Sequence, residues 1–450
     1  MKSGKTDHFT KKLLTLVLPI AFQQFMLALV SASDALMLGF LSQDALSAVS
    51  LASQIAFVEN LFLAAMTIGL SMLAAQYWGK GDRVSVEKIF AYVMKITAAV
   101  SFVFFLAGLL LPQALMHIFT NDPALLDGGT VYLRTVSLSF LLTGISQIYL
   151  CIFKNTGKAV KASVISSVSV VLNILLNAVF IFGLFGFPKL AIAGAALATV
   201  VARITEVLWC IAEAAKKDGI KLKLHCLLHD DKPLRHDFWK YTAPVLGNEI
   251  VWGVGFTMYS VIMGHLGTDA VAANAIANIV KNLVACFCLG LGSGGGIMVG
   301  NELGAGHPDK AKEYGSRLCK LSLLCGAVSG ALIVALTPLI LSVTDLSSTA
   351  TTYLKYMLLM CSYYMIGRAA NSTTIAGIFC AGGDSKFGFL CDTVTMWCVT
   401  VPLGFLSAFV FRLPVLAVYF IINLDEIVKL PASYRHYKKY KWVNNLTVKE

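Results

Sequence analysis

Long apolar segments recur along the whole chain, and they constrain its fold more than any other feature. Twelve of them are long enough to cross a bilayer, which takes about 20 apolar residues in a helix. Hydrophobic residues make up 57% of the 450 residues and charged residues only 14%, too few charges to cover a soluble protein of this size. No segment alternates in the manner of a barrel strand. The sequence therefore predicts an all-α polytopic membrane protein and excludes disorder or a disulfide scaffold.

The predicted spans follow one another with short polar connections. Several exceed the thickness of the apolar core of a bilayer, which predicts tilt or protrusion from the membrane. The twelve predicted spans are residues 13–41, 46–78, 88–118, 128–153, 162–187, 190–215, 238–265, 270–302, 311–343, 350–380, 387–411 and 413–432.

Basic residues are distributed unevenly over the connections. An even number of spans places both termini on one side, where the segments carry 26 lysines and arginines, Lys429 and the run 435–441 among them. The opposite loops carry only Lys189 and Arg412. Because cytoplasmic loops are enriched in Lys and Arg, we predict a multi-pass protein of the cell membrane with both termini cytoplasmic. This asymmetry explains the net charge of +11 without a nucleic-acid partner, and leaves membrane lipid as a contact of the basic tail.

The second half of the chain repeats the first at an offset of 225 residues, at which Pro19 aligns with Pro244 and all four glycines between residues 19 and 88 fall on glycines. Six spans per half make the halves parallel repeats, related by a pseudo-two-fold axis along the membrane normal. We predict two six-helix lobes, residues 1–215 and 238–450, the second with a basic tail, joined by a cytoplasmic linker at 216–237. The aligned glycine pairs are Gly39 and Gly264, Gly69 and Gly294, Gly79 and Gly304, and Gly81 and Gly306.

Several short stretches, in this order and partly duplicated, resemble the multidrug and toxic compound extrusion (MATE) family along nearly the whole chain. They are LPIA at 18–21, DALMLG at 34–39, AAQYWG at 74–79, NILLN at 173–177, GAALAT at 194–199, GHLG at 264–267 and GAG at 304–306. The resemblance implies export of organic cations and other amphipathic compounds, driven by inward flow of protons or sodium ions.

An ionisable residue at membrane depth is costly and is therefore a candidate functional residue. Asp34 lies in the outer half of the first predicted helix. The resemblance implies that an acid here binds the coupling ion, with Asn173, Asn177 and Thr199 as its neighbours. Oxygen groups of this kind suit sodium, and the carboxylate can equally carry a proton. Part of the family has an acid in place of Asn177, so the residues leave both ions open, and an Asp that only supports helix packing is the alternative.

A second set of residues is predicted to line a central substrate cavity: Glu249, Lys281, Glu59 and Tyr259. Glu249 would attract a cationic substrate, and Lys281 would tune the pKa of Glu249. Alternatively, Glu249 and Lys281 pair with each other, or Glu59 pairs with Lys281. Tyr259 is the repeat equivalent of Asp34, so the lobes differ at this position.

The remaining charges inside spans are predicted to pair. Arg203 and Glu206 lie three residues apart on one helix, a spacing that brings side chains together. Arg368 and Asp392 are a predicted pair between two neighbouring helices.

Pro19 and Pro244 each remove a backbone hydrogen bond inside a helix and favour a kink, which acts either as a hinge or as a static packing feature. Six glycines between Gly290 and Gly300 permit close helix packing, the reading that we prefer to a hinge.

Other function classes lack their motifs. The sequence contains no GxxxxGK[ST] phosphate loop, no GxSxG and no HExxH, so we expect neither an ATP-driven pump nor an enzyme. We predict a monomeric antiporter for small amphipathic or cationic molecules that needs no cofactor and no metal beyond a coupling H⁺ or Na⁺. The alternative is a lipid-linked oligosaccharide flippase of the same superfamily, although its pyrophosphate substrate would favour a cavity dominated by Arg and Lys.

Overall fold

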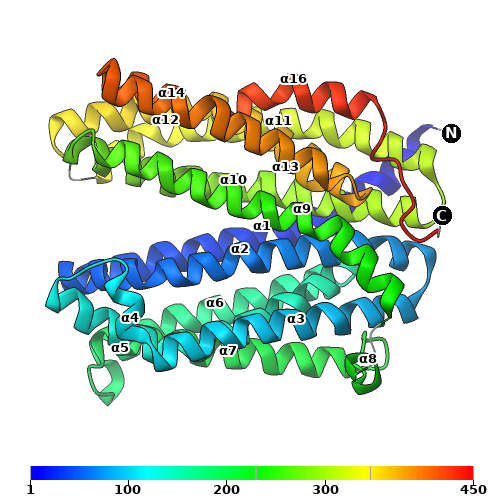
Figure 1. Ribbon diagram of the computed structural model, residues 1–450, viewed down its shortest axis with the longest axis horizontal. Helices are drawn as coiled ribbons and strands as arrows, with labels where there is room; N and C mark the ends of the chain where they lie inside the picture. Colours follow the sequence, from blue (N-terminus) through cyan, green and yellow to red (C-terminus); the bar gives the residue numbers. More distant parts are fainter. Residues whose placement is uncertain (1, 229–230, 345, 449–450) are drawn as a thin grey trace. The chain divides into compact units, whose positions relative to one another are not determined.

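The computed structural model describes residues 2–228, 231–344 and 346–448, and within these ranges the chain is almost entirely helical and contains no strand (Figure 1). Ten helices of this described part are long and apolar enough to cross a membrane. In chain order the elements are α1 (Lys2–Leu41), α2 (Gln43–Lys80), α3 (Arg83–Leu110), α4 (Pro112–His117), α5 (Pro123–Asn155), α6 (Ala159–Phe182), η1 (Leu184–Gly186), α7 (Ala191–Ala214), α8 (Leu224–Leu228), α9 (Lys232–Gly264), α10 (Thr268–Gly304), α11 (Pro308–Val343), α12 (Ser348–Asn371), η2 (Ser372–Phe379), α13 (Ser385–Thr393), η3 (Val394–Thr400), α14 (Val401–Phe405), η4 (Leu406–Val410), α15 (Val415–Ile422) and α16 (Asp425–Lys438).

The helices follow the predicted spans closely, and the differences have local causes. The third span divides into α3 and α4 because Pro112 has no N–H to continue the first helix and begins the second. The tenth and eleventh spans contain π-helical stretches, η2, η3 and η4. The twelfth is broken at Asn423 between α15 and α16. Because α12 and α15–α16 are not among the ten apolar helices, the full count of twelve spans stays a prediction.

The chain divides into two compact units. Unit 1 consists of Met1–Phe25, Ala75–Gly81 and Trp239–Glu450, and unit 2 consists of Met26–Ala74 and Asp82–Phe238. The first part of α1 and the last turn of α2 therefore pack with the second half of the chain. The two predicted lobes, residues 1–215 and 238–450, are each continuous in sequence, unlike these units. The lobe boundaries stay a prediction.

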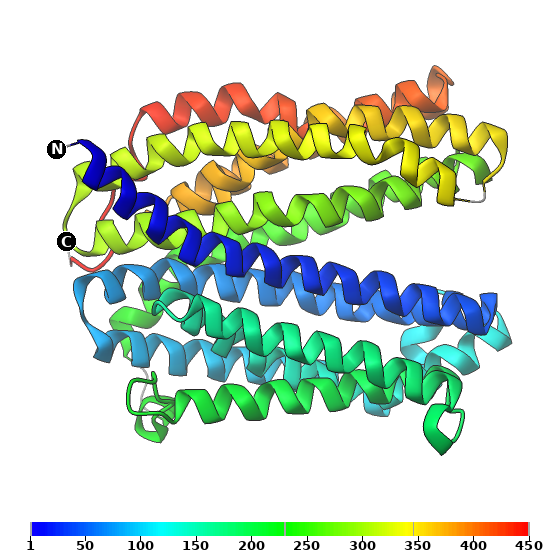
Figure 2. The ribbon, with the colours of Figure 1, turned by 180° about the vertical axis from the view of Figure 1, so that it is seen from behind.

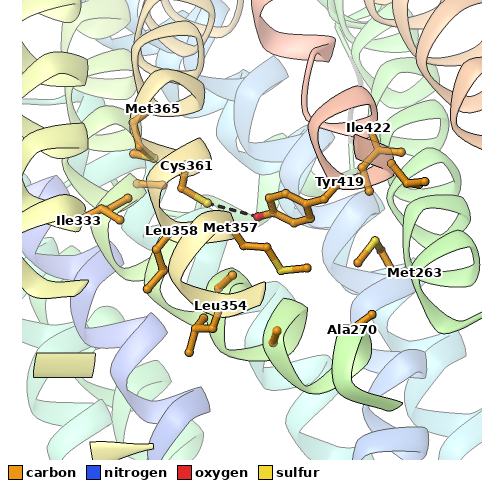
Figure 3. Close-up of a cluster of buried hydrophobic side chains, with 14 of the residues drawn as sticks. Met263, Ala270, Ile333, Leu354, Met357, Leu358, Cys361, Met365, Tyr419 and Ile422 are labelled. Carbon is orange, nitrogen blue, oxygen red and sulfur yellow. Dashed lines mark hydrogen bonds between the residues drawn. The ribbon is translucent and has the colours of Figure 1, made fainter. Parts of the chain in front are cut away.

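Unit 1 is built around α10, α11 and α12, and α11 and α12 lie side by side in Figure 1. Their core is a cluster of buried apolar side chains that includes Ile333, Leu354, Met357 and Leu358 (Figure 3). Tyr419 of α15 reaches the same cluster, and its hydroxyl lies 3.3 Å from Cys361 Sγ. Burial on most sides of α10 explains its near-continuous apolar sequence. The helix α11 also exposes apolar side chains such as Val328 and Leu339.

The glycine-rich part of α10 packs closely against its neighbours, as predicted. An added Cβ at Gly290 would lie 2.6 Å from Ala21 Cβ, and one at Gly294 would lie 2.8 Å from Val17 Cγ2, both on α1. On another face, a Cβ at Gly292 would lie 2.7 Å from the Ser372 carbonyl oxygen of η2. Glycine is required along this helix because neighbouring backbones approach within side-chain distance.

The internal repeat is visible as a reciprocal contact in unit 1. An added Cβ at Gly79 would collide with the carbonyl group of Asn301, and one at Gly304 would collide with that of Gln76. Gly79 and Gly304 are equivalent at the 225-residue offset, and so are Gln76 and Asn301. At the crossing of the ends of α2 and α10, each helix therefore places its glycine against the backbone carbonyl group of the other helix.

The C-terminal tail is folded onto this crossing. The Gln76 side chain is fully buried; its Nε2 donates to the carbonyl oxygens of Ala381 (2.7 Å) and Asn444 (3.1 Å), and its Oε1 accepts from the N–H of Leu446 (2.7 Å). Lys80 Nζ donates to the Thr447 carbonyl oxygen at 3.0 Å. The end of the chain, predicted as a basic cytoplasmic tail, is therefore held beyond residue 441 by hydrogen bonds to its backbone.

Unit 2 contains the helices α3, α5, α6 and α7, of which α6 and α7 run side by side in Figure 2. The segment predicted as a linker folds back onto this unit through ion pairs. Lys88 contacts Asp231 at 2.9 Å and Lys223 contacts Glu87 at 2.5 Å. The hydrogen bond and negative charge of Glu87 raise the pKa of Lys223, so Lys223 stays charged at neutral pH.

Candidate ion-coupling site

The four residues predicted to bind the coupling ion lie together in unit 2. Asn177 Nδ2 on α6 donates to Asp34 Oδ1 on α1 at 2.5 Å, and to Asn173 Oδ1 at 3.1 Å. Asn173 Nδ2 donates to Thr199 Oγ1 on α7 at 3.2 Å, and that hydroxyl donates to the Ala195 carbonyl oxygen at 3.0 Å. One hydrogen-bonded chain therefore joins α1, α6 and α7.

This chain lies in an apolar setting. Leu38, Ile181 and Ala195 of these helices form a buried cluster with Val49 of α2, and Tyr132 of α5 packs against it. The Tyr132 hydroxyl is within electrostatic range of the Asp34 carboxylate. Apolar surroundings strengthen electrostatic interactions within the site.

The site has an unused acceptor. Asn177 Oδ1 is buried and has no hydrogen-bond partner within the described residues. Together with the Asp34 carboxylate, it supplies oxygen atoms that suit a hard cation. The carboxylate alone suffices for a proton.

Charged residues deeper in unit 2 follow the predicted pairing. Arg203 Nη1 contacts Glu206 Oε2 at 2.5 Å, which confirms that pair. The Arg203 guanidinium is also within electrostatic range of Asp34 and Glu59. Glu59 is 2% exposed.

The other predicted cavity residues, Glu249, Lys281 and Tyr259, belong to unit 1. Lys281 Nζ donates to Asn423 Oδ1 at 3.3 Å and lies 4.6 Å from the centre of the Tyr364 ring. Its polar contacts are therefore neutral groups, and the alternative in which it pairs with Glu249 is wrong.

The Tyr259 hydroxyl lies 2.5 Å from Thr400 Oγ1, which ties α9 to η3. A single cavity lined by Tyr259, the other two unit 1 residues and Glu59 stays a prediction.

The predicted pair of Arg368 and Asp392 is also wrong. Arg368 Nη1 contacts Glu426 Oε1 at 3.1 Å, whereas Asp392 Oδ1 lies 2.8 Å from Lys429 Nζ. Lys429 is 3% exposed and has Asp425 and Glu426 within 4.0 Å. It was counted with the cytoplasmic cations, but it is the centre of a buried ionic cluster, because the chain breaks after α15 at Asn423 and α16 turns the next acids and Lys429 inward.

Sequence reasoning missed this cluster and Tyr132. A signal for the cluster was present, since two consecutive acids, Asp425 and Glu426, followed by Lys429 fall inside the last predicted span. No local signal marked Tyr132, because an aromatic residue in an apolar helix is most often part of the core.

The two predicted kink residues are inside their helices. Pro19 is internal to α1 and Pro244 is internal to α9. Both are in the segments assigned to unit 1. Their role as hinges stays a prediction.

The ten long apolar helices of the described chain are those of a multi-pass membrane protein. The MatE family model matches residues 19–179 and 244–406. The two matches begin at Pro19 and Pro244, the residues that the internal repeat aligns, and together they cover more than half of the chain. The chain belongs to the MatE family of multidrug efflux transporters.

Similar proteins cover nearly the full length. The chain is 23% identical over 439 residues to an uncharacterized transporter, YisQ, of Bacillus subtilis (strain 168), covering 96% of this chain and 95% of that protein. It is 22% identical over 439 residues to a probable multidrug resistance protein NorM of Thermotoga maritima, covering 97% and 94%. A solved MOP superfamily transporter from Pyrococcus furiosus has the same fold, with a TM-score of 0.88 at 15% identity, covering 98% and 97% of the two chains.

Proposed function

We propose that this protein is a secondary active antiporter that exports organic cations and drugs in exchange for inward protons or sodium ions by alternating access. The observation that carries the proposal is the 2.5 Å hydrogen bond between Asn177 Nδ2 and Asp34 Oδ1. It continues through Asn173 to Thr199, so the charge of one carboxylate acts on three helices.

Binding of the coupling ion would change this connection. A hydrogen bond to an ionised carboxylate is stronger than one between neutral groups. A proton on Asp34 removes the charge, and a sodium ion competes for the carboxylate oxygen and attracts the free Asn177 Oδ1. Either ion weakens the link from α1 to α6, which allows the outer part of α1 to move and the substrate to leave outward.

The substrate class follows from the charges and from the relatives. Asp34, Glu59 and Glu249 are carboxyl groups inside spans, and they favour a cationic substrate. The NorM relative is named as a probable multidrug resistance protein, which favours drug export over the flippase alternative.

The energetics are sufficient with one ion per cycle. One charge that moves inward through about 100 mV supplies about 2.3 kcal/mol. At about 1.4 kcal/mol per tenfold, this supports a roughly 50-fold substrate gradient.

The proposal includes a monomer in the cell membrane with both termini cytoplasmic. Figure 1 marks both ends of the chain at the same end of unit 1. The N-terminal part of α1 and the end of α10 are joined there by an ion pair of Lys12 and Glu302 at 3.1 Å. The basic residues of the connections support the cytoplasmic assignment.

The test is ethidium efflux from proteoliposomes that contain the purified protein, with a proton gradient and a sodium gradient imposed separately. Efflux should follow one gradient and be lost in Asp34→Asn, while that variant keeps the thermal stability of the wild type. Gradient-driven efflux at the wild-type rate in Asp34→Asn would overturn the assignment of the coupling site.

A further inference from the structure

Unit 2 contains a second buried carboxyl group, Glu59, whose chemistry the proposed coupling site leaves unexplained. It lies in the middle of α2 and is 2% exposed. Its Oε1 has no hydrogen-bond partner within the described residues. An unpaired carboxylate is among the most costly groups to bury in a membrane protein, so Glu59 is poorly suited to a packing role.

An unpartnered hydroxyl group, that of Ser101 on α3, lies beside the Glu59 carboxyl group. Thr97 is one helical turn from Ser101; both side chains are fully buried, and both hydroxyl oxygens are without partners in the described part of the chain. An added Cβ at Gly144 of α5 would collide with Ser101 Oγ. The helices α2 and α3 thus supply unused oxygen atoms, and α5 packs directly against the Ser101 hydroxyl group.

This group of residues lies deeper in the membrane than Asp34. Asp34 is seven residues from the end of α1 at Leu41, and Glu59 is sixteen residues from the start of α2 at Gln43. At 1.5 Å per residue these positions are about 10 Å and about 24 Å from the connection between the two helices. Glu59 is therefore about 14 Å further from the outer connection than Asp34, in the direction of the cytoplasm.

The Arg203 guanidinium and two more unpartnered oxygen atoms belong to the same part of unit 2 as Asp34 and Glu59. The Arg203 charge acts on both carboxyl groups. Glu206 Oε1 and Asn177 Oδ1 are also buried without partners in the described residues. Buried polar groups of this kind are commonly satisfied by internal water molecules, each of which makes about three hydrogen bonds. Water molecules between Asp34 and Glu59 would satisfy these atoms.

The other charged groups of unit 2 lie away from this point. On α3 they are Arg83, Glu87, Lys88 and Lys95, on α5 Asp127, Arg134 and Lys154, on α6 Lys161, and on α7 Glu213 beside the pair of Arg203 and Glu206. Most of these residues lie toward the ends of their helices, as does Asp44 on α2. Lys95 is two residues from Thr97, but its Nζ donates to the Leu227 carbonyl oxygen at 3.5 Å. Arg134 is exposed. The net charge around Glu59 is therefore set by Glu59, Arg203 and Glu206 and is negative by one when all are ionised.

We propose that Glu59, with the hydroxyl groups of Ser101 and Thr97, forms a second cation site of unit 2, which holds a proton or a small monovalent cation on its way inward from Asp34. This inference rests on the proposed antiport. It adds an inner carboxyl group to the coupling pathway and gives Glu59 a role with the coupling ion beyond its contribution to a negatively charged interior.

Infrared difference spectroscopy of the protein in liposomes, between about pH 5 and about pH 9, combined with gradient-driven ethidium efflux, tests the proposal. The spectrum should contain a protonated-carboxyl band that disappears in Glu59→Gln and persists in Asp34→Asn. Ethidium efflux should fall to the rate of empty liposomes in Glu59→Gln, while the Asp34 band remains. Sodium chloride in place of choline chloride at constant pH removes the Glu59 band if sodium occupies the site and leaves it unchanged if only protons do.

Two further variants guard against misfolding. Glu313→Gln removes an exposed acid of α11 that pairs with Arg317 at 2.6 Å, and it should leave the spectrum and the efflux unchanged. Ser101→Ala should shift the Glu59 band without removing it.

Efflux at the wild-type rate in Glu59→Gln, or a spectrum identical to that of the wild type, would overturn the second site. If instead the wild type shows no gradient-driven efflux but the Glu59 band is present and responds to Ser101→Ala, the site stands and the proposed substrate class fails.

Discussion

Replacement of Gln76 by alanine tests whether the C-terminal tail is a structural part of unit 1. The side chain is fully buried and makes three hydrogen bonds, to the backbone of Ala381, Asn444 and Leu446, at 2.7, 3.1 and 2.7 Å. Two of these bonds, to Asn444 and Leu446, hold the tail, and at about 1 kcal/mol net for each bond the tail loses about 2 kcal/mol. At about 1.4 kcal/mol per tenfold, local opening of the tail should become about 30-fold more frequent.

Hydrogen–deuterium exchange measures this opening directly. The Leu446 amide should exchange about 30-fold faster in Gln76→Ala, while amides in the cores of α5 and α12 keep their wild-type rates. Gln54→Ala is the matched control, because Gln54 is an exposed glutamine of the same helix. Unchanged exchange at Leu446 in Gln76→Ala would refute the reasoning, since it would mean that the buried amide does not hold the tail.

Three further substitutions test other contacts. Gly294→Val should lower the free energy of unfolding by about 1–3 kcal/mol, because its Cβ would lie 2.8 Å from Val17; an unchanged melting temperature would contradict the close packing. Lys429→Met should cost about 3–5 kcal/mol, because it leaves buried carboxylates uncompensated; thermal unfolding measures this, and a variant as stable as the wild type would count against the ionic cluster. Asn177→Ala should slow gradient-driven ethidium efflux about 10- to 100-fold, because it removes a charge-assisted bond to Asp34; normal efflux would show that the link is dispensable.

The extent of each helix could be predicted well because a bilayer sets a minimum apolar length. The start of α10 was placed at 270 and lies at Thr268, and the end of α11 was placed at 343 and lies at Val343. The breaks inside the last three spans could not be predicted. A π-helical turn such as η3 changes one hydrogen bond per turn and leaves the apolar pattern intact.

The partners of buried charges were harder to predict than their presence. Arg203 and Glu206 are on one helix, so their spacing alone determines the contact. Arg368 contacts Glu426 and not Asp392, because a contact between helices depends on the rotation of each helix about its own axis. That rotation is set by packing, which the sequence does not display locally.

The coupling site was predicted by family resemblance more than by the residues themselves. Asp34 was marked by its cost in the membrane. Asn173 and Asn177 are ordinary polar residues, and only the resemblance singled them out. The role of Gln76 was not predicted, because its partners are backbone groups about 370 residues further along the chain, and a backbone group has no sequence signature.

The same distance has a consequence for synthesis. Leu446 follows Gln76 by 370 positions, and at about 5–20 residues per second a ribosome needs about 20–70 s to cover that interval. Throughout this time the amide of Gln76 at the end of α2 is without its final partners, and Gly79 lacks its contact with Asn301 until α10 has been made. The first helices must therefore be inserted and kept in a provisional arrangement, and the last turns of the chain complete the packing of one of its earliest helices.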